Sequence, residues 1–277
     1  GNGGTQKITG YIRKGAAFNG SSSKINTGIV LSSTTFSISV WINTSVNDRA
    51  IIGNFNSSGS PSPSNRDGFY LMANKYVISN DDVEVVNESY NAGSLADGSW
   101  HNIVITNDGS NSKIYIDGSL DRTDNSSSWN TLSTQDIHLG FLQRSPIVNW
   151  FTGKIDQVRV FNKAISSSEV TTLYGETYDS STKSTTDIFG DSSGLALYEL
   201  DEDASDTGGT YNGTPTDVNF LGMAFQPDFV WIKGRSDAEG ARLFDSIRGA
   251  NKAIFSNSTG EETTVTNEQT SIDANDF

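Results

Sequence analysis

Aromatic side chains within polar segments are the residues of this 277-residue chain best suited to bind a ligand. Trp129 lies among serines and asparagines, Trp150 precedes a strand-like segment, and Tyr90 is followed by Asn91. An aromatic ring can pack against the apolar face of a sugar, while nearby polar side chains bind its hydroxyl groups. We therefore predict Trp129, Trp150, Tyr90 and Asn91 as candidate ligand-binding residues. For each aromatic residue the alternative is a structural role at an edge of the fold.

The two histidines of the chain give little support to acid–base catalysis. His101 stands at the start of a strand-like segment, and His138 lies between Ile137 and Leu139. Because strand side chains alternate between faces, His138 is expected on the face opposite Ile137 and Leu139. We interpret both histidines as structural.

Three carboxylates follow an apolar segment near residue 200. Asp201, Asp203 and Asp206 have a spacing similar to the start of an EF-hand loop, but the glycine and distal glutamate of that motif are missing. We interpret this segment as a solvated acidic turn.

The elements that must position these residues are mainly strands. Phe36, Ile38, Val40 and Ile42 alternate with small polar residues, which is typical of a half-buried antiparallel strand. Trp41 and Trp100 lie in such segments and are predicted to be core residues. The other predicted elements are a short helix at residues 166–173, capped by Ser167 or Ser168, and long polar loops at residues 54–68 and 121–135.

Composition excludes several classes of protein. The chain has no cysteine, so neither disulfides nor thiolate metal sites hold the fold. The formal net charge is −14, and residues 179–277 carry 18 acidic against 6 basic side chains. A nucleic-acid interface requires a basic surface, which this composition does not provide. No apolar run reaches the ~18 residues that a membrane-spanning helix requires.

Five segments in a fixed order resemble the laminin-G-like, concanavalin-A-like jelly-roll family. They are residues 18–20, 36–42, 97–105, 113–118 and 153–166. The resemblance covers roughly residues 11 to 176 and implies an all-β, antiparallel β-sandwich that binds carbohydrate or a surface. The glucanases that share this fold carry Glu-x-Asp-x-x-Glu on one strand, and the chain has no such segment. We therefore expect no enzymatic activity.

The same resemblance implies calcium as a possible cofactor. The family's Phe-Asp-Gly turn corresponds to Phe18-Asn19-Gly20, and the family's strand aspartate corresponds to Asp156. Asn19 and Asp156 are therefore the expected metal ligands. A neutral amide at Asn19 replaces the usual carboxylate, and a hydrogen-bonded structural role for Asp156 is the alternative.

The sequence also suggests how the chain is divided. We predict a sandwich at residues 1–176, a linker at 177–193, a strand motif at 194–220, and a partial β-rich domain at 221–277. The motif at 194–220 resembles the opening of a laminin-G-like unit. It either begins a second tandem unit, which is the commoner arrangement, or closes the first sandwich. Residues 223–277 resemble a domain found in tail-fibre and other virion proteins of bacteriophages, especially marine ones.

These resemblances together imply an adhesin on the exterior of a phage particle. A tail fibre is the first expectation. Its expected partners are a host surface glycan or glycoprotein and other virion proteins, and fibres of this kind are usually trimers. Nucleic acid and membrane insertion are not expected. The alternatives are a structural or decoration protein of the virion, and an accessory binding module of a secreted bacterial enzyme.

Overall fold

The computed structural model describes most of the first 221 residues and four short strands beyond them. The described ranges are 15–57, 66–80, 83–125, 133–143, 147–176, 181–221, 229–232, 242–245, 252–255 and 263–264. The chain forms two compact units, Gly1–Leu221 and Gly222–Phe277, which we describe separately. No helix within the described ranges is long and apolar enough to cross a membrane.

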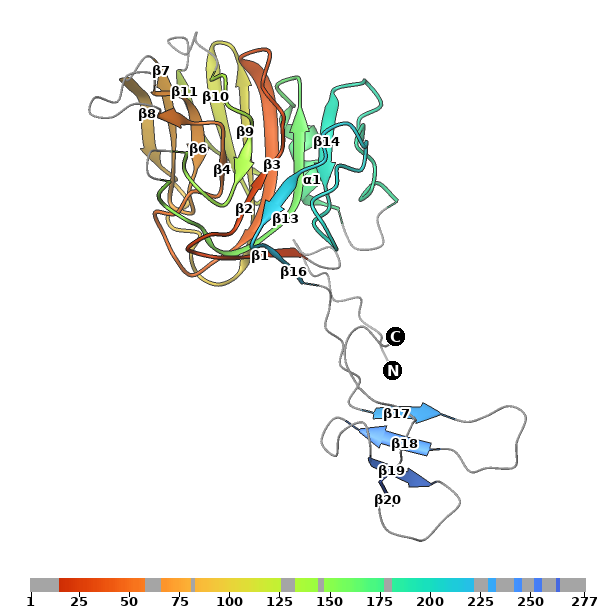
Figure 1. Ribbon diagram of the computed structural model, residues 1–277. Coiled ribbons are helices and arrows are strands. Elements are labelled where there is room, and N and C mark those ends of the chain that lie inside the picture. The colour runs from red at the N-terminus through yellow and green to blue at the C-terminus, as the bar shows by residue number, and fades with distance from the viewer. Residues whose placement is uncertain are drawn as a thin grey trace. The chain divides into compact units, whose positions relative to one another are not determined.

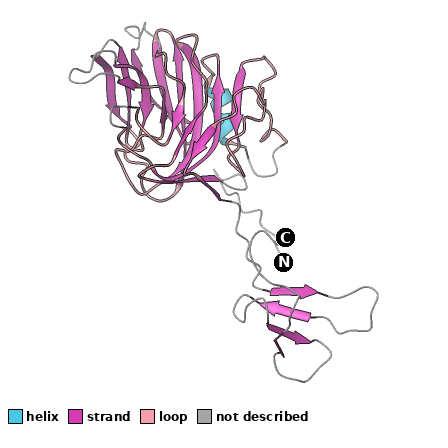
Figure 2. Cartoon of the chain, in the orientation of Figure 1, coloured by secondary structure: helices cyan, strands magenta, loops and turns pink. Residues whose placement is uncertain are grey.

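The first unit is a sandwich of two antiparallel sheets (Figures 1 and 2). Sheet A consists, in spatial order, of β11 (Ser119–Asn125), β10 (Asn111–Ile116), β9 (Trp100–Asp108), β3 (Thr35–Asn43), β13 (Thr152–Phe161), β1 (Gly15–Asn19) and β16 (Asn219–Leu221), with β14 (Gly194–Tyr198) also paired to β13. Sheet B consists of β15 (Thr214–Thr216), β2 (Lys24–Asn26), β12 (His138–Leu139), β4 (Ile52–Gly53), β6 (Arg66–Leu71), β7 (Lys75–Asn80) and β8 (Val83–Ser89), with β5 (Asn56–Ser57) paired to β6. The predicted antiparallel jelly-roll sandwich is confirmed.

Period-two alternation builds the core between the sheets. Phe36, Ile38, Val40 and Ile42 of β3 are all fully buried in the main apolar cluster. Burial of each such side chain contributes about 1.5–3 kcal/mol to the free energy of folding. The four side chains of β3 therefore stabilise the centre of sheet A. Trp41 is buried, as predicted, but it points to the other face of sheet A, outside the main apolar cluster, and stacks on Tyr174 with ring centroids 5.5 Å apart.

Helix α1 (Ser167–Tyr174) covers part of the outer face of sheet A. Val170 and Leu173 pack with Phe161 and other apolar residues of that face. The helix begins with a capping box in which Ser166 accepts from the Glu169 backbone N–H and the Glu169 side chain accepts from Ser166. The cap is therefore Ser166, which lies before both predicted positions, Ser167 and Ser168.

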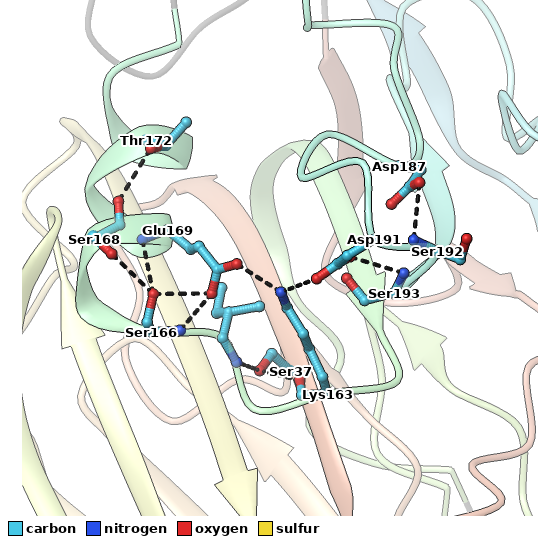
Figure 3. A network of polar contacts seen from close by, with 11 residues as sticks. Ser37, Lys163, Ser166, Ser168, Glu169, Thr172, Asp187, Asp191, Ser192 and Ser193 are labelled. Carbon is cyan, nitrogen blue, oxygen red and sulfur yellow. Dashed lines mark hydrogen bonds and ion pairs between the residues drawn. The ribbon is translucent and has the colours of Figure 1, made fainter.

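Lys163 joins the helix to the chain segment that follows it (Figure 3). Its ammonium group lies 2.6 Å from Glu169 Oε1, is hydrogen-bonded to Asp191, and lies 4.9 Å from the centre of the Phe189 ring. Ser37 of β3 accepts a hydrogen bond from Ile165 N and so holds the start of the helix against sheet A.

The predicted linker is partly packed structure. The buried Arg159 guanidinium forms an ion pair of 3.1 Å with Glu176 and donates to the carbonyl oxygens of Thr182 and Thr185. These contacts hold the segment against β13, so its described residues, 181–193, do not form a free linker. The polar composition that suggested a linker reflects turns, which also require Ser, Thr and Asp.

Residues 194–221 complete the first sandwich. β14 pairs with β13, β15 with β2, and β16 with β1. Ala196, Tyr198, Leu200 and Ala204 are buried in the main core. The segment therefore occupies the closing position, whereas a tandem unit would have placed these side chains in a separate core.

Two segments that we predicted as loops contain strands in the parts that the structure describes. The segment 121–135 begins inside β11, which extends to Asn125, and residues 126–132 lie outside the described residues. The segment 54–68 contains β5 and the start of β6, while residues 58–65 lie outside the described residues.

The second unit contains a small antiparallel sheet. Its strands are β17 (Phe229–Ile232), β18 (Arg242–Asp245), β19 (Lys252–Phe255) and β20 (Thr263–Thr264), which pair in that order.

Candidate carbohydrate-binding site

One row of residues crosses the outer face of sheet B, the face turned away from the core. The strand registers place the following residues side by side across this row: Thr214, Asn26, His138, Gly53, Tyr70 and Val77. Ile25 and Leu139, which alternate with residues of the row, belong to the core. The expected position of His138, opposite Ile137 and Leu139, is therefore confirmed.

Stacked aromatic rings stand on this row. The His138 ring lies 4.4 Å from the Phe141 ring, and the Phe141 ring lies 5.8 Å from the Trp150 ring, measured between ring centroids. His138 and Phe141 are buried, whereas Trp150 is partly exposed. The Lys24 ammonium lies 5.6 Å from the centre of the Phe141 ring. Trp150 is thus an aromatic surface supported by Phe141, and the Lys24 cation lies beside that supporting ring.

One hydrogen bond defines the tautomer of His138, and burial defines its charge. Its Nδ1 lies 3.0 Å from the Asp136 carbonyl oxygen, which can only accept, so we place the proton on Nδ1. Burial lowers the pKa of His138 to about 4, although the Asp136 carbonyl and carboxylate oppose this shift. The ring is therefore neutral near pH 7, and it supports Phe141 as an uncharged stacking partner.

Polar side chains surround the aromatic stack on the side of β2 and β15. Lys24 and Asn26 are partly exposed on β2, and Thr214 and Thr216 are exposed on β15. Together they offer one ammonium, one amide and two hydroxyl groups next to an aromatic surface. This is the combination of groups that binds sugar rings and their hydroxyls.

Among the predicted ligand-binding residues, Trp150 alone is placed in this cluster. Tyr90 is a core residue: its hydroxyl donates to the Met72 carbonyl oxygen at 2.8 Å and its ring stacks on Tyr76. Asn91 belongs to a turn in which its backbone N–H donates to Asp121. These contacts explain both residues structurally, so their predicted ligand role has no support here. Trp129 lies outside the described residues.

The two expected calcium ligands are not brought together. Asn19 faces Thr152 in the β1–β13 pair, and Asp156 lies four residues further along β13. Four residues span about 13 Å along a strand, which is too far for both side chains to bind one cation. Within the described residues, no group of three or more acidic or histidine side chains is arranged to hold a metal.

Each of these two side chains instead supports local backbone structure. The amide oxygen of Asn19 accepts from the backbone N–H groups of Ser21, Ser22 and Ser23 at 2.9–3.2 Å. The fully buried Asp156 accepts from Gln157 N at 2.8 Å, where β13 contains a bulge. The amide nitrogen of Asn19 also donates to Ser22 Oγ at 3.0 Å, a hydrogen bond that an ionised carboxylate at this position could not donate.

The acidic turn after β14 is organised by a buried carboxylate. Asp206 is 3% exposed, unlike a solvated side chain. Its two oxygens accept hydrogen bonds from the backbone N–H groups of Leu197, Gly208, Thr210 and Tyr211. Asp206 therefore fixes this turn, and the expectation of a simply solvated segment is wrong for it.

Neither histidine forms a catalytic pair with a serine among the described residues. His101 is bound by Asp117 at 2.8 Å and Asp97 at 3.2 Å. Gly190–Gly194 has the spacing of a nucleophile elbow, Gly-x-Ser-x-Gly, but it leads into β14 where that motif requires a helix. The backbone N–H of Ser192 donates to Asp187, which makes this segment a structural turn.

Sequence reasoning missed Lys24, Asn26, Phe141, Thr214 and Thr216. Lys24 and Asn26 flank the core residue Ile25, so alternation was a usable signal for their outward direction. No comparable signal placed Thr214 and Thr216 beside them, because that neighbourhood depends on a pairing between distant parts of the chain.

Two family models match the chain. The model of the concanavalin A-like lectin/glucanases superfamily matches residues 18–171. A second model, a domain of unknown function (DUF7483), matches residues 203–277. No curated protein matches the chain.

Solved structures share the fold at low identity. A protein of Bacteroides ovatus described as carbohydrate binding is 16% identical, with a TM-score of 0.52; the match covers 76% of this chain and 60% of that protein. The SAP-like pentraxin of Limulus polyphemus is 12% identical over 59% of this chain and 83% of its own, with a TM-score of 0.47. The CBM40 of a Ruminococcus gnavus sialidase is 14% identical over 59% of this chain and 97% of its own, with a TM-score of 0.46.

The chain thus spans less than two thirds of the Bacteroides ovatus protein, and at these identities the likeness is one of fold. The first family model, by contrast, matches more than half of the sequence. The chain belongs to the concanavalin A-like lectin/glucanases superfamily.

Proposed function

We propose that the sandwich is a non-catalytic carbohydrate-binding module that holds a glycan against Trp150 on the outer face of sheet B. The observation that carries this proposal is the aromatic stack of Trp150, Phe141 and His138, flanked by Lys24 and Asn26. A partly exposed ring supported from below keeps its orientation without a ligand, which reduces the entropic cost of binding. The description of the Bacteroides ovatus protein as carbohydrate binding agrees with this proposal.

The chemistry of the stack favours binding over hydrolysis. Glycoside hydrolysis generally requires two carboxyl groups on either side of the scissile bond. The polar groups that border the aromatic stack on β2 and β15 are an ammonium, an amide and hydroxyls, and the neutral His138 is buried beneath Phe141. This set can orient a sugar, and it offers neither a nucleophile nor a general acid.

We further propose that the module works in many copies, as part of an adhesin on the exterior of a phage particle such as a trimeric tail fibre. The support is the resemblance of residues 223–277 to a domain of phage virion proteins. Several weak sites displayed together bind a surface far more tightly than one site, because later contacts are intramolecular. The ligand would then be a host surface glycan or glycoprotein. Electron microscopy of particles labelled with an antibody against this chain tests the location.

The binding proposal is tested with the full chain, fused to a trimerisation domain, on immobilised glycans. We expect retention without the release of new reducing ends. Trp150→Ala should weaken binding by roughly 1–3 kcal/mol if the ring is an apolar anchor. Trp100→Ala, which removes a partly exposed tryptophan from sheet A, is the matched control and should bind normally.

Two results would overturn the proposal in different ways. Release of reducing ends would identify a depolymerase. Absence of retention in monomeric and trimeric forms would leave a structural role in the particle, the alternative that the sequence also allows.

A further inference from the structure

Strand β15 borders the candidate site although it comes from a distant part of the sequence. It pairs with β2 so that Thr214 lies opposite Asn26 and Thr216 lies opposite Lys24. Directly paired side chains in antiparallel strands have Cβ atoms about 4.5–5.5 Å apart. Both threonines are exposed, and both share the outer face with the residues opposite them.

The middle residue of β15 explains why this edge stays available. Pro215 lies opposite Ile25 and has no N–H to offer to another strand. A proline on an edge strand prevents further sheet pairing, so the edge of sheet B is protected from self-association. The threonines on either side of Pro215 are exposed, so their hydroxyl groups are open to a soluble ligand.

We infer that Thr214 and Thr216 form the outer side of the glycan site, so that an oligosaccharide extends from Trp150 past Lys24 onto β15. This inference rests on the proposed function. Hydroxyl groups donate and accept hydrogen bonds, and they match the hydroxyl groups of a neutral sugar chain. The site is then composite: residues matched by the lectin/glucanase family supply the aromatic stack, and residues matched by the second family supply this side.

Strand β15, which carries the outer side of the composite site, is attached to the sandwich by few contacts. The Ser23 hydroxyl donates to the Asp217 carbonyl oxygen, and β16 then pairs with β1 before the chain leaves the sandwich at residue 221. β15 and β16 have three residues each, so the outer side of the site is held by few backbone pairs. Glycan binding at this side therefore requires that β15 stays paired with β2.

The test uses the full chain, trimerised as above, on an array of immobilised oligosaccharides from disaccharides to hexasaccharides, including arabinotriose and α2,6-sialyllactose. Thr214→Val with Thr216→Val removes both hydroxyls but keeps the β-branched shape. We expect the Trp150-dependent signal to fall about fivefold or more, because two hydrogen bonds are lost. Thr214→Ser with Thr216→Ser, which keeps the hydroxyls, should restore it.

Thr123→Val is the matched control, because Thr123 is an exposed strand threonine on β11 of sheet A. It should leave the signal unchanged, and melting temperatures should be equal across all variants. A Trp150-dependent signal that is unaffected by the double valine variant would overturn the inference and leave the proposed function intact. Absence of any signal from the unmodified chain would instead refute the proposed function and the inference together.

Discussion

At the scale of single residues, His138 links the core of sheet B to the candidate site. Its buried ring supports Phe141, and its pKa is lowered to about 4 by burial. The unfolded chain takes up a proton at this histidine near pH 6.5, whereas the folded chain does not until pH 4. Stability is therefore lost as the pH falls through this range.

We expect His138→Phe to remove this part of the acid sensitivity. A shift of this size corresponds to a loss of about 3 kcal/mol between pH 6.5 and pH 4, since one pKa unit is about 1.36 kcal/mol. The measurement is urea unfolding of the wild type and the variant at several pH values. Equal pH dependence of the two free energies of unfolding would show that His138 is not buried as a neutral ring.

Asn19 provides a test of the calcium expectation. Because its amide oxygen already accepts from three backbone N–H groups, we expect EDTA to leave the melting temperature unchanged. Asn19→Ala should lower stability by about 1 kcal/mol, equally with and without calcium, because it removes the hydrogen bonds of this turn. A melting temperature that drops in EDTA and recovers with calcium would contradict this account.

At the scale of elements, Arg159 holds the segment after α1 against sheet A. Its guanidinium and the Glu176 carboxylate are both buried, so removal of either partner leaves an uncompensated charge. We expect Arg159→Ala to destabilise the sandwich by about 3–5 kcal/mol, measured by urea unfolding. The double variant, Arg159→Ala with Glu176→Ala, should be destabilised by less than the sum of the two single variants, because it removes both charges. A double variant destabilised by the full sum of the single variants would contradict a direct ion pair between Arg159 and Glu176.

Sequence patterns predicted the long elements well and the short ones poorly. The alternation of β3 and the outward direction of His138 follow from local sequence, because each has apolar neighbours at period two. β15 and β16 have too few residues to show a period, and their partners lie about 190 and about 200 positions earlier in the chain, respectively. Local sequence therefore leaves the choice between tandem unit and closing strands to the general frequency of tandem arrangements.

For the candidate site, too, local sequence indicated some features and not others. Trp150 could be selected from its polar surroundings, but so could Tyr90, whose ring is buried against Tyr76. Local sequence does not distinguish an aromatic residue that packs between two sheets from one that stands on an outer face. That distinction depends on tertiary contacts, such as the contact of Phe141 with Trp150.

At the scale of the whole molecule, the first unit extends to residue 221. We expect a chain of residues 1–221 to melt at a higher temperature than one of residues 1–178. The shorter chain lacks β14–β16 and the buried Ala196, Tyr198, Leu200 and Ala204. Loss of such core side chains costs several kcal/mol. Equal melting temperatures in circular dichroism would instead favour residues 194–221 as part of a separate unit.

The central claim is that glycan binds at Trp150 on the outer face of sheet B. Its most direct test is a titration of the isotope-labelled chain with an oligosaccharide from the array, followed through the indole N–H signals of its tryptophans by NMR. We expect the Trp150 signal to shift and the signal of Trp41, which is buried beside Tyr174 on sheet A, to stay in place. A binding-dependent shift at Trp41 or Trp129 with none at Trp150 would contradict the account.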